Sequence, residues 1–538
     1  MILLDKIMKF VKKNYEKIIN ILLIILTINV FCYIFFFCKP LLNSDSSFVV
    51  DYSLEQIRTK TFFPVNWYNT NDFWVYSLIP LITVFLKLGI SLFTSRQLSV
   101  FIQTILLFLL IYDFYKNYMN DKKGFKIILI LLLSGISGEF MFEMYADATY
   151  ATIIFYMLLE LRFLMKYFKG KKLKDLIFFV IILSILTACS LRFPIFIAAP
   201  IIVTILYFIY QDGMKKHHFN MLIGIVLATI IGFIGNKLLI HNLSYVNLTN
   251  LEVMGTYEKL SENIMSAIFN YLFLSGGSGL SIYSLTMYNT IQINASSPFI
   301  VVIFIKFIYT IITVIMPFRL LKKIKIMSSE EKMLYLFTTS FIGLIIFFLI
   351  IGNMATWYRY LIPVVFFISM LVPLYYKYYF KDINKRKIVF EISMWLFAIA
   401  SLMLVFLSFF NVKEFKIREN SYQKIISELQ NRHLSFGYTI NGNEHNLYRT
   451  LSNGEIQVIR LSDDGKEMDH WLNSLEWYSE DYYQGKVFLI RNPDDVSPVF
   501  EKFYIEHFTI EGYEVFVFDS NSIVLNNIKI GDYHETKK

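Results

Sequence analysis

Residues suited to chemistry appear first at positions 43–47, where the run Asn-Ser-Asp-Ser-Ser directly follows a long apolar segment. A carboxylate just beyond the end of a membrane helix is held by that helix and stays open to water and lipid headgroups. Asp45 is therefore a candidate general base. Asp and Ser are also common helix N-caps, so the alternative interpretation is that Asp45 caps the following helix or is simply solvated.

A second group of acids, Glu139, Glu143 and Asp147, lies where two predicted helices meet. Successive members are four residues apart, so all three share one helical face. No Lys or Arg is nearby in the sequence, and uncompensated carboxylates against a membrane are costly. We therefore predict that Glu143 and Asp147 take part in the chemistry and hold a divalent cation such as Mg²⁺ or Mn²⁺. The alternative is a solvated turn.

Isolated basic residues occur at the same predicted depth as these acids. The planar guanidinium of arginine donates two parallel hydrogen bonds, which suits it to a phosphate group. The predicted substrate-binding residues are Arg58, Lys60, Arg96, Arg192, Arg359 and Tyr360. Each basic residue could instead pair with an outer carboxylate or extend into the headgroups. Lys306, midway along another apolar segment, is expected to face the interior of the bundle.

Other kinds of site are not indicated by the sequence. The glycine-rich run 276–279 lacks the Lys-Ser or Lys-Thr of a phosphate-binding loop, so no nucleotide cofactor is predicted. Three cysteines cannot supply a disulfide framework, and redox chemistry is not expected. His217 and His218 lie in a basic segment and are interpreted as a solvated turn rather than a metal pair.

The composition places these residues in a membrane protein. The chain has 538 residues, of which 56% are hydrophobic and 17% charged, and this is too apolar for an ordinary soluble domain. The net charge of +9 is divided unevenly, with +16 in residues 1–410 and −7 in residues 411–538. We therefore predict a transmembrane domain over 1–410, a soluble domain over 411–538 and no nucleic-acid partner.

The transmembrane domain is predicted to be a polytopic helix bundle, since each crossing of the ~30 Å hydrocarbon core needs roughly 20 mostly apolar residues. About eleven crossings are expected, near residues 18–37, 98–115, 126–141, 147–165, 175–190, 195–210, 219–239, 298–317, 333–351, 361–376 and 389–410. With the N-terminus in the cytoplasm, 26 of the 37 Lys and Arg residues before position 411 fall in cytoplasmic segments, as the positive-inside rule requires. The prediction is a multi-pass protein of the plasma membrane with an extracytoplasmic C-terminal domain.

The apolar segment 73–93 is not counted as a crossing, because counting it would reverse every later segment and destroy this charge asymmetry. We expect it to lie along the outer membrane surface, with its aromatic residues at headgroup level. Long outer loops are then predicted at 39–97 and 240–297. The working surface of the protein is therefore placed outside.

The C-terminal tail is predicted to be a small α+β domain. It begins with an amphipathic helical stretch at 420–433 and continues with alternating, strand-like segments at 455–461, 486–490 and 513–518. Asn-Gly and Asp-Gly pairs between them indicate turns.

The order of the motifs resembles the GT-C superfamily of membrane glycosyltransferases, which includes protein O-mannosyltransferases and the bacterial aminoarabinose transferase. Asp45 matches the Asp that the family places after its first helix, and Asp147 matches the Asp that opens its fourth. Arg96 closes Leu-Gly-Ile-Ser-Leu-Phe-Thr-Ser-Arg, which is similar to the family's turn before helix two. Arg359-Tyr360, before a helix with Pro363, matches a late Arg-Tyr.

The resemblance implies an inverting transfer of a sugar from a polyprenyl-phosphate-linked donor to a cell-envelope polysaccharide or other glycan, a teichoic-acid-like polymer or a lipid. Asp45 would take the acceptor proton, and Arg192, Arg359 or a divalent cation at Glu143 and Asp147 would stabilise the departing phosphate. Three alternatives stay open: a transporter or flippase of lipid-linked sugars, a polysaccharide polymerase or ligase of another membrane fold, and a non-catalytic scaffold.

Overall fold

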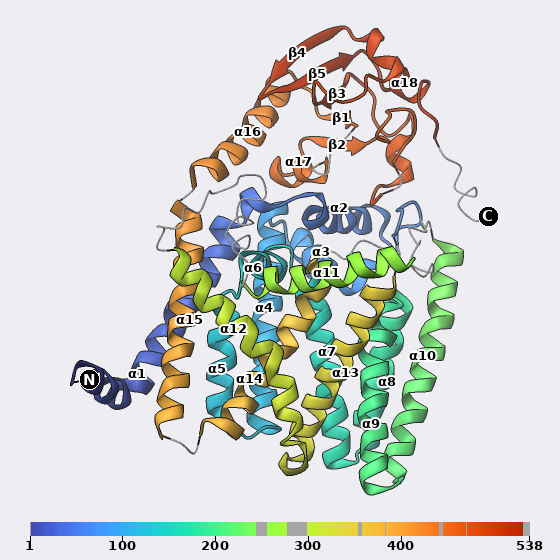
Figure 1. The fold of residues 1–538 in the computed structure, drawn as a ribbon. Coiled ribbons are helices and arrows are strands. Elements are labelled where there is room, and N and C mark those ends of the chain that lie inside the picture. The colour runs from blue at the N-terminus through green and yellow to red at the C-terminus, as the bar shows by residue number, and fades with distance from the viewer. Residues whose placement is uncertain are drawn as a thin grey trace.

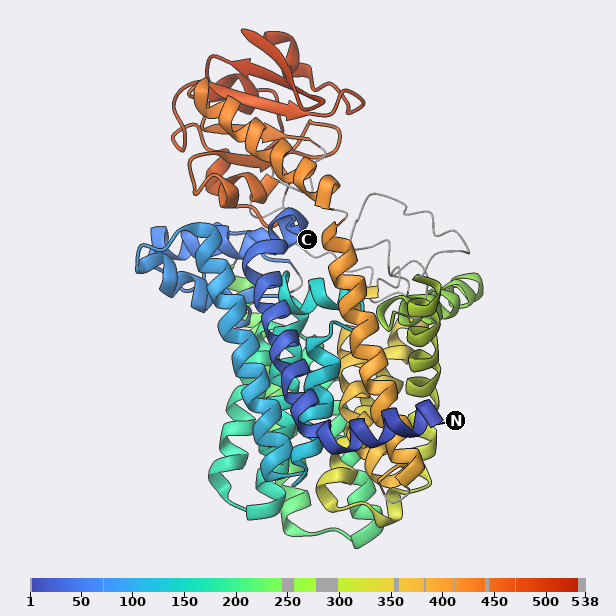
Figure 2. The same cartoon turned by 90° about the vertical axis from the view of Figure 1, so that its left-hand side faces the viewer.

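The computed structural model describes residues 2–530 except 71, 244–255, 277–298, 353–357, 382–383, 411, 441–444 and 470. Long helices form a bundle, and a small domain with a five-stranded sheet stands on one end of it (Figure 1). A view turned by 90° shows α15 (Asn384–Phe410) rising along the bundle towards α16 (Val412–Asn431) of this domain (Figure 2). We call the end of the bundle that carries the domain the domain end.

Every predicted crossing overlaps a helix or a pair of helices. The other long helices are α1 (Ile2–Cys32), α4 (Leu92–Asn117), α5 (Lys122–Leu133), α7 (Thr149–Gly170), α8 (Leu173–Cys189), α9 (Ala199–Asp212), α10 (Lys216–Asn242), α12 (Phe299–Leu321), α13 (Ser329–Ile351) and α14 (Ile362–Tyr379). Seven helical segments within the described residues, at α1, α4, α9, α10, α12, α13 and α14, are long and apolar enough to cross a membrane. They indicate a multi-pass membrane protein.

The predicted count of eleven crossings is not confirmed. α8 has 17 residues and is about 26 Å long, shorter than the hydrocarbon core, and α7 and α15 are also outside the set of seven. α5 and the short α6 (Gly138–Tyr145) would form one broken crossing, bent by 102°. The number of crossings and the orientation of the termini therefore stay predictions.

A further layer of helices lies at the domain end. They are α2 (Ser44–Thr59), α3 (Ile79–Lys87), α6 and α11 (Tyr257–Leu274) (Figure 1). α3 has nine residues and is about 14 Å long, so it is too short for the segment 73–93 to cross as one helix, as predicted. Within the predicted outer loop 240–297, residues 257–274 form the 18-residue helix α11, which Thr256 caps. Much of the remaining loop lies outside the described residues.

The C-terminal domain is the α+β domain that the sequence predicts. Its sheet has the order β2-β1-β3-β5-β4, with β1 parallel to β2 and β3, and β5 antiparallel to β3 and β4. The strands are β1 (Phe436–Thr439), β2 (Gln457–Arg460), β3 (Val487–Arg491), β4 (Glu506–Ile510) and β5 (Tyr513–Phe518). The predicted helix overlaps α16 and the predicted strands overlap β2, β3 and β5, whereas β1 and β4 were not predicted as strands.

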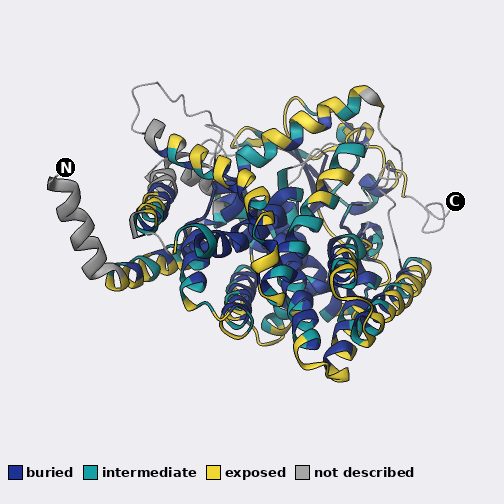
Figure 3. Cartoon of the chain, turned by 60° about the horizontal axis from the view of Figure 1, so that its bottom comes forward, coloured by how far each residue is buried: buried dark blue, intermediate teal, exposed yellow. Residues whose placement is uncertain are grey.

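Buried residues fill the interior of the bundle, while exposed residues lie on its outward surfaces (Figure 3). As predicted, Lys306 of α12 faces this interior and is 0% exposed. Its ammonium group donates hydrogen bonds to the carbonyl of Ile136 and the hydroxyl of Ser401, and lies 4.1 Å from the ring centroid of Phe397. Because Ile136 lies at the bend between α5 and α6, these contacts brace the bend that carries α6.

The helices α8 and α10 approach closely at Gly232, where an added Cβ would clash with Thr187 and lie 2.7 Å from the carbonyl oxygen of Ser184. We expect Gly232→Val to force the helices apart and to destabilise the protein by about 1–3 kcal/mol. A lower midpoint of thermal unfolding in detergent would show this. Gly343→Val is the matched control, since nothing lies within 4 Å of a Cβ at Gly343. Equal midpoints for the two variants would contradict the close packing.

The C-terminal domain is docked on α2 through polar contacts. Trp477 donates its indole N–H to Glu55 Oε1 at 3.0 Å, and Arg58 Nη1 donates to Glu476 Oε1 at 2.8 Å. Glu55 is 1% exposed, and the domain that covers its carboxylate also supplies a hydrogen-bond donor to it, the indole of Trp477. These contacts join the domain to the bundle over the second half of α2.

A titratable group lies at the centre of this interface. Asp51 of α2 is 1% exposed, and its Oδ1 lies 3.4 Å from Arg449 Nη1 of the domain. Burial raises the pKa of Asp51 to about 7, although Arg449 opposes this rise, and the nearby Glu55 adds to it. The folded chain therefore binds this proton more tightly than the unfolded chain, in which the pKa of an aspartate is about 3.9.

The stabilisation from this proton is fully present below pH ~4 and is lost as the pH rises to ~7. We expect the midpoint of thermal unfolding to fall more steeply between pH 5 and pH 8 in the wild type than in Asp51→Asn. Thermal scans in detergent at several pH values measure the difference. Parallel pH profiles for the two proteins would refute it.

Candidate active site

The helix α2 begins within the polar run that the sequence singled out. The Asn43 side chain accepts a hydrogen bond from the Ser46 backbone N–H at 2.9 Å, and the Ser46 hydroxyl accepts one from the Asn43 N–H at 2.9 Å. This reciprocal pair fixes the start of the helix. Asp45 lies in the first turn, so the interpretation of Asp45 as the cap is wrong. A carboxylate in a first turn is stabilised by the helix dipole.

Asp45 forms an ion pair with Arg359. Arg359 Nη1 donates to Asp45 Oδ2 at 3.1 Å, and the two side chains are 34% and 42% exposed, respectively. Arg359 lies on the short helix η7 (Tyr358–Leu361), directly before α14. The pair therefore joins two segments far apart in the sequence and remains accessible from outside the bundle.

The helix α6 and the turn after it bring two more carboxylates to this pair. Glu143, buried in α6, lies within electrostatic range of Asp147, Arg359 and Asp45. Asp147, in the turn before α7, lies within range of Arg96, Asp45 and Arg359. Arg359 lies within range of both acids and Arg96 within range of Asp147, so arginines from distant segments supply the positive charge that the neighbouring sequence lacks. The predicted catalytic residues Asp45, Glu143 and Asp147 are thus brought together.

Arg96 ties the two acidic segments to each other. It is in the first turns of α4 and is 0% exposed. Its Nε donates to the carbonyl of Ser46, and its Nη2 donates to the carbonyls of Ala146 and Asp147. The guanidinium thus binds the backbone beside Asp45 and at Asp147. This geometry favours a positioning role for Arg96 over the predicted contact with substrate.

Replacing Arg96 with Met would leave these buried carbonyls without their donor. Each unsatisfied carbonyl costs about 1–3 kcal/mol, so we expect Arg96→Met to lower the midpoint of thermal unfolding strongly. Arg162→Met is the control, because Arg162 is 25% exposed and pairs with Asp113, a single side chain. A variant of Arg96 as stable as the Arg162 variant would contradict the bridging role.

A second predicted residue, Arg192, lies in the short helical start just before η4 (Pro194–Ala198). Its Nη2 lies 2.8 Å from Asp72 Oδ2, a partner that the sequence analysis did not identify. Arg192 and Arg359 both lie within electrostatic range of Tyr150 and of the predicted Tyr360. The two arginines therefore share two tyrosine neighbours, which places their charges around one site.

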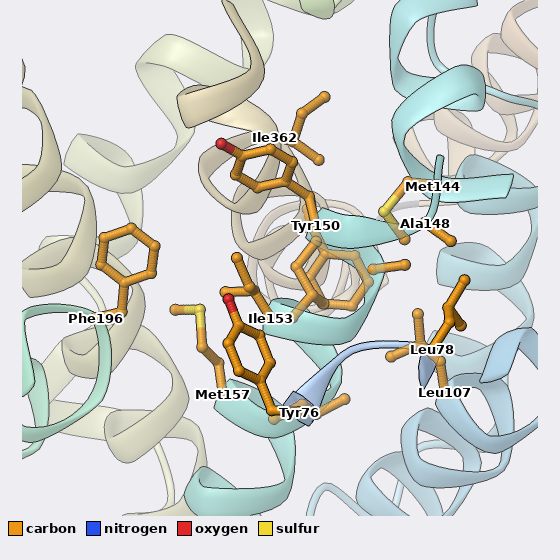
Figure 4. Packing of buried hydrophobic residues seen from close by; sticks show 14 of the residues in the cluster. Tyr76, Leu78, Leu107, Met144, Ala148, Tyr150, Ile153, Met157, Phe196 and Ile362 are labelled. Carbon is orange, nitrogen blue, oxygen red and sulfur yellow. The ribbon is translucent and has the colours of Figure 1, made fainter. Parts of the chain in front are cut away.

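The tyrosine between these arginines was also missed. Tyr150 is 4% exposed and follows Asp147 by three residues in α7. Its ring lies beside Ile362 in the packed interior (Figure 4). Its position one turn after Asp147 was the signal available in the sequence. Because the ring of Tyr150 is buried and packed, its hydroxyl is a hydrogen-bonding group in a fixed position.

Arg58 and Lys60 are not brought to the Asp45 cluster. Arg58 follows Asp45 by 13 residues in α2, a distance of about 20 Å along the helix. It pairs with Glu55 and Glu476 at the interface with the C-terminal domain. Lys60 is the exposed, left-handed residue that ends α2. Their predicted role in substrate binding therefore has no geometric support.

The residues predicted to hold a divalent cation are suited to it in chemistry. Carboxylate oxygens are the ligands that Mg²⁺ and Mn²⁺ prefer, and Mg²⁺ commonly uses one or two of them together with substrate phosphate. Asp147 Oδ1 is buried and has no hydrogen-bond partner among the described residues, and Glu143 is its neighbour. No group of three or more metal-ligating His, Cys, Asp or Glu side chains occurs in the described part of the chain.

Comparison with protein-family models gives no match, and comparison with curated proteins finds no similar sequence.

Proposed function

We propose that this protein is a membrane glycosyltransferase that moves a sugar from a polyprenyl-phosphate donor to an extracytoplasmic acceptor. The acceptor would be a cell-envelope glycan, a teichoic-acid-like polymer or a lipid. The observation that supports this most strongly is the accessible Asp45 carboxylate paired with Arg359, beside Glu143 and Asp147. A base and a cation able to bind phosphate thus meet at one site, where the GT-C resemblance expects them. In this proposal the domain end faces outwards from the plasma membrane.

The reaction joins the acceptor oxygen to the anomeric carbon while the bond from that carbon to the carrier phosphate breaks. Asp45 takes the proton of the acceptor hydroxyl as it attacks. The electron pair of the broken bond stays with the phosphate, which gains negative charge that Arg359 and Arg192 stabilise. Attack from the side opposite the phosphate inverts the anomeric configuration.

The ion pair between Asp45 and Arg359 suggests how the base is released. The carrier phosphate binds a guanidinium through two parallel hydrogen bonds and so competes with Asp45 for Arg359. Donor binding would then free the carboxylate for the acceptor proton. A divalent cation held by Glu143 and Asp147 would supply further positive charge to the phosphate.

The proposal is tested with purified protein in liposomes that contain labelled polyprenyl-phosphate glucose, mannose or aminoarabinose and an extract of cell-envelope acceptors. We expect free polyprenyl phosphate to be released in step with a labelled product of inverted anomeric configuration. Movement of intact donor across the bilayer, with no release of polyprenyl phosphate, would rule out transfer.

A transporter or flippase of lipid-linked sugars is the second candidate, and two buried ionisable groups favour it. Glu160 of α7 is 0% exposed, and neither of its carboxylate oxygens has a hydrogen-bond partner among the described residues. It follows Thr149 by 11 residues, about 16 Å along α7 from the domain end. Lys306 is also buried inside the bundle. Ionisable groups at this depth often mark transport pathways.

A further inference from the structure

One side of α2 is a stripe of polar residues buried beneath the C-terminal domain. Ser44, Asp51 and Glu55 recur at intervals of seven and four residues, so they share a helical face. They are 4%, 1% and 1% exposed, respectively. Each contacts the C-terminal domain. Burying such groups is costly unless they are paired, so this stripe specifies where the domain sits.

The contact nearest the candidate active site is made by α17 (His445–Leu451) of the domain. His445 Nδ1 lies 3.2 Å from the Ser44 hydroxyl oxygen, which also accepts a hydrogen bond from the Asn446 backbone N–H at 3.3 Å. His445 and Asn446 are each 1% exposed. The first residue of α2 is therefore held by two groups of the C-terminal domain.

Ser44 is the residue directly before Asp45. Its backbone shares the first turn with Asp45, and Arg96 holds the other side of that turn through the Ser46 carbonyl. A shift of Ser44 would therefore move the Asp45 carboxylate relative to Arg359. Reaction rates depend on sub-ångström placement of such groups, because a misplacement of about 1 Å can cost roughly 100-fold.

We propose that the C-terminal domain is a working part of the active site, and that His445 acts through Ser44 as a positioning residue for Asp45. The claim that His445 affects the reaction rate rests on the proposed function, because it takes Asp45 as the base. The claim that His445 holds the start of α2 does not. The domain thus does more than extend from the membrane, since it fixes the start of the helix that carries Asp45.

The test compares Ser44→Ala, Ser44→Thr and Ser47→Ala in the full-length protein. Ser47 is the matched control, since it lies in the same helix, is 0% exposed, and its hydroxyl has no hydrogen-bond partner among the described residues. We expect Ser44→Ala to lower kcat about 10-fold with the KM for the donor unchanged. The midpoint of thermal unfolding should also fall, because the buried Asn446 N–H loses its acceptor. Ser44→Thr keeps the hydroxyl, so its kcat should equal that of the wild type.

His445→Ala should lower kcat as Ser44→Ala does, and the double variant should be no slower than either single variant, because both act through one contact. Additive losses would overturn this coupling. An unchanged kcat for Ser44→Ala in an active protein would overturn the positioning role.

A second readout does not depend on activity. Amide hydrogen exchange across residues 44–50 should become faster in Ser44→Ala than in Ser47→Ala, because the first turn of α2 loses its contact with α17. Equal exchange in the two variants would refute the inference whatever the protein catalyses. Faster exchange in a protein that transfers no sugar would instead refute the proposed function and leave the coupling of the domain to α2 intact.

Discussion

Asp45→Asn is expected to retain at most a few per cent of the wild-type rate of sugar transfer. The amide has nearly the shape of the carboxylate and can still accept a hydrogen bond from Arg359, but it cannot take the acceptor proton. General-base assistance contributes about 10²- to 10⁴-fold, so its loss dominates the rate. The rate of polyprenyl phosphate release by the purified variant measures it.

Asp113→Asn provides the matched control for this prediction. Asp113 also pairs with an arginine, Arg162, but it lies near the end of α4 away from the domain end. We expect this variant to keep the wild-type rate. If Asp45→Asn turned over as fast as Asp113→Asn, Asp45 would not be the base.

Arg359→Gln is expected to lower kcat by about 10²- to 10³-fold, the range found when one donor to a developing negative charge is removed. The glutamine side chain is uncharged, so it does not stabilise the negative charge of the leaving phosphate and forms no ion pair with Asp45. Arg359→Lys keeps the charge but loses the two-pronged geometry, and should lie between Arg359→Gln and the wild type. Steady-state rates with the donor varied give kcat and KM separately.

The double variant Asp45→Asn/Arg359→Gln distinguishes two roles for Arg359. If Arg359 only orients Asp45, the double variant is no slower than Asp45→Asn alone. If Arg359 also stabilises the phosphate, as proposed, the double variant is slower than either single variant. A normal kcat for Arg359→Gln would contradict both roles.

The sequence identified the acids of the cluster because they lie near the ends of the predicted crossings. Asp45 directly follows an apolar run, and Glu143 and Asp147 are four residues apart, so local spacing predicts their placement. The C-terminal strands β2, β3 and β5 were predicted from alternation and turns. The placement of residues that lie close in sequence, within one helix or strand, could therefore be predicted.

The tertiary partners of these residues were not predictable from one sequence. Arg96 binds backbone carbonyls, which carry no side-chain signature, and Asp72 meets Arg192 across more than a hundred intervening residues. β1 has four residues, all of them buried, and pairs with β2 and β3, which come later in the chain.

The contacts of the C-terminal domain were the least predictable feature. The sequence marked residues 411–538 as soluble and acidic, but charge balance does not show where such a domain docks. Its contacts with α2 depend on single groups, such as His445 beside Ser44, whose pairing appears only when the two segments meet. Composition therefore separates the apolar part of the chain from the acidic part, and only the fold relates one to the other.

The central claim is that Asp45, Glu143, Asp147 and Arg359 surround the head of a lipid-linked sugar. Photo-crosslinking with a polyprenyl-phosphate sugar that carries a diazirine on the sugar ring tests this most directly, with mass spectrometry to locate the attachment. The claim predicts labelling of peptides from residues 43–51, 141–150 and 358–363, suppressed by excess unlabelled donor. Labelling confined to other helices, or left unchanged by unlabelled donor, would contradict it.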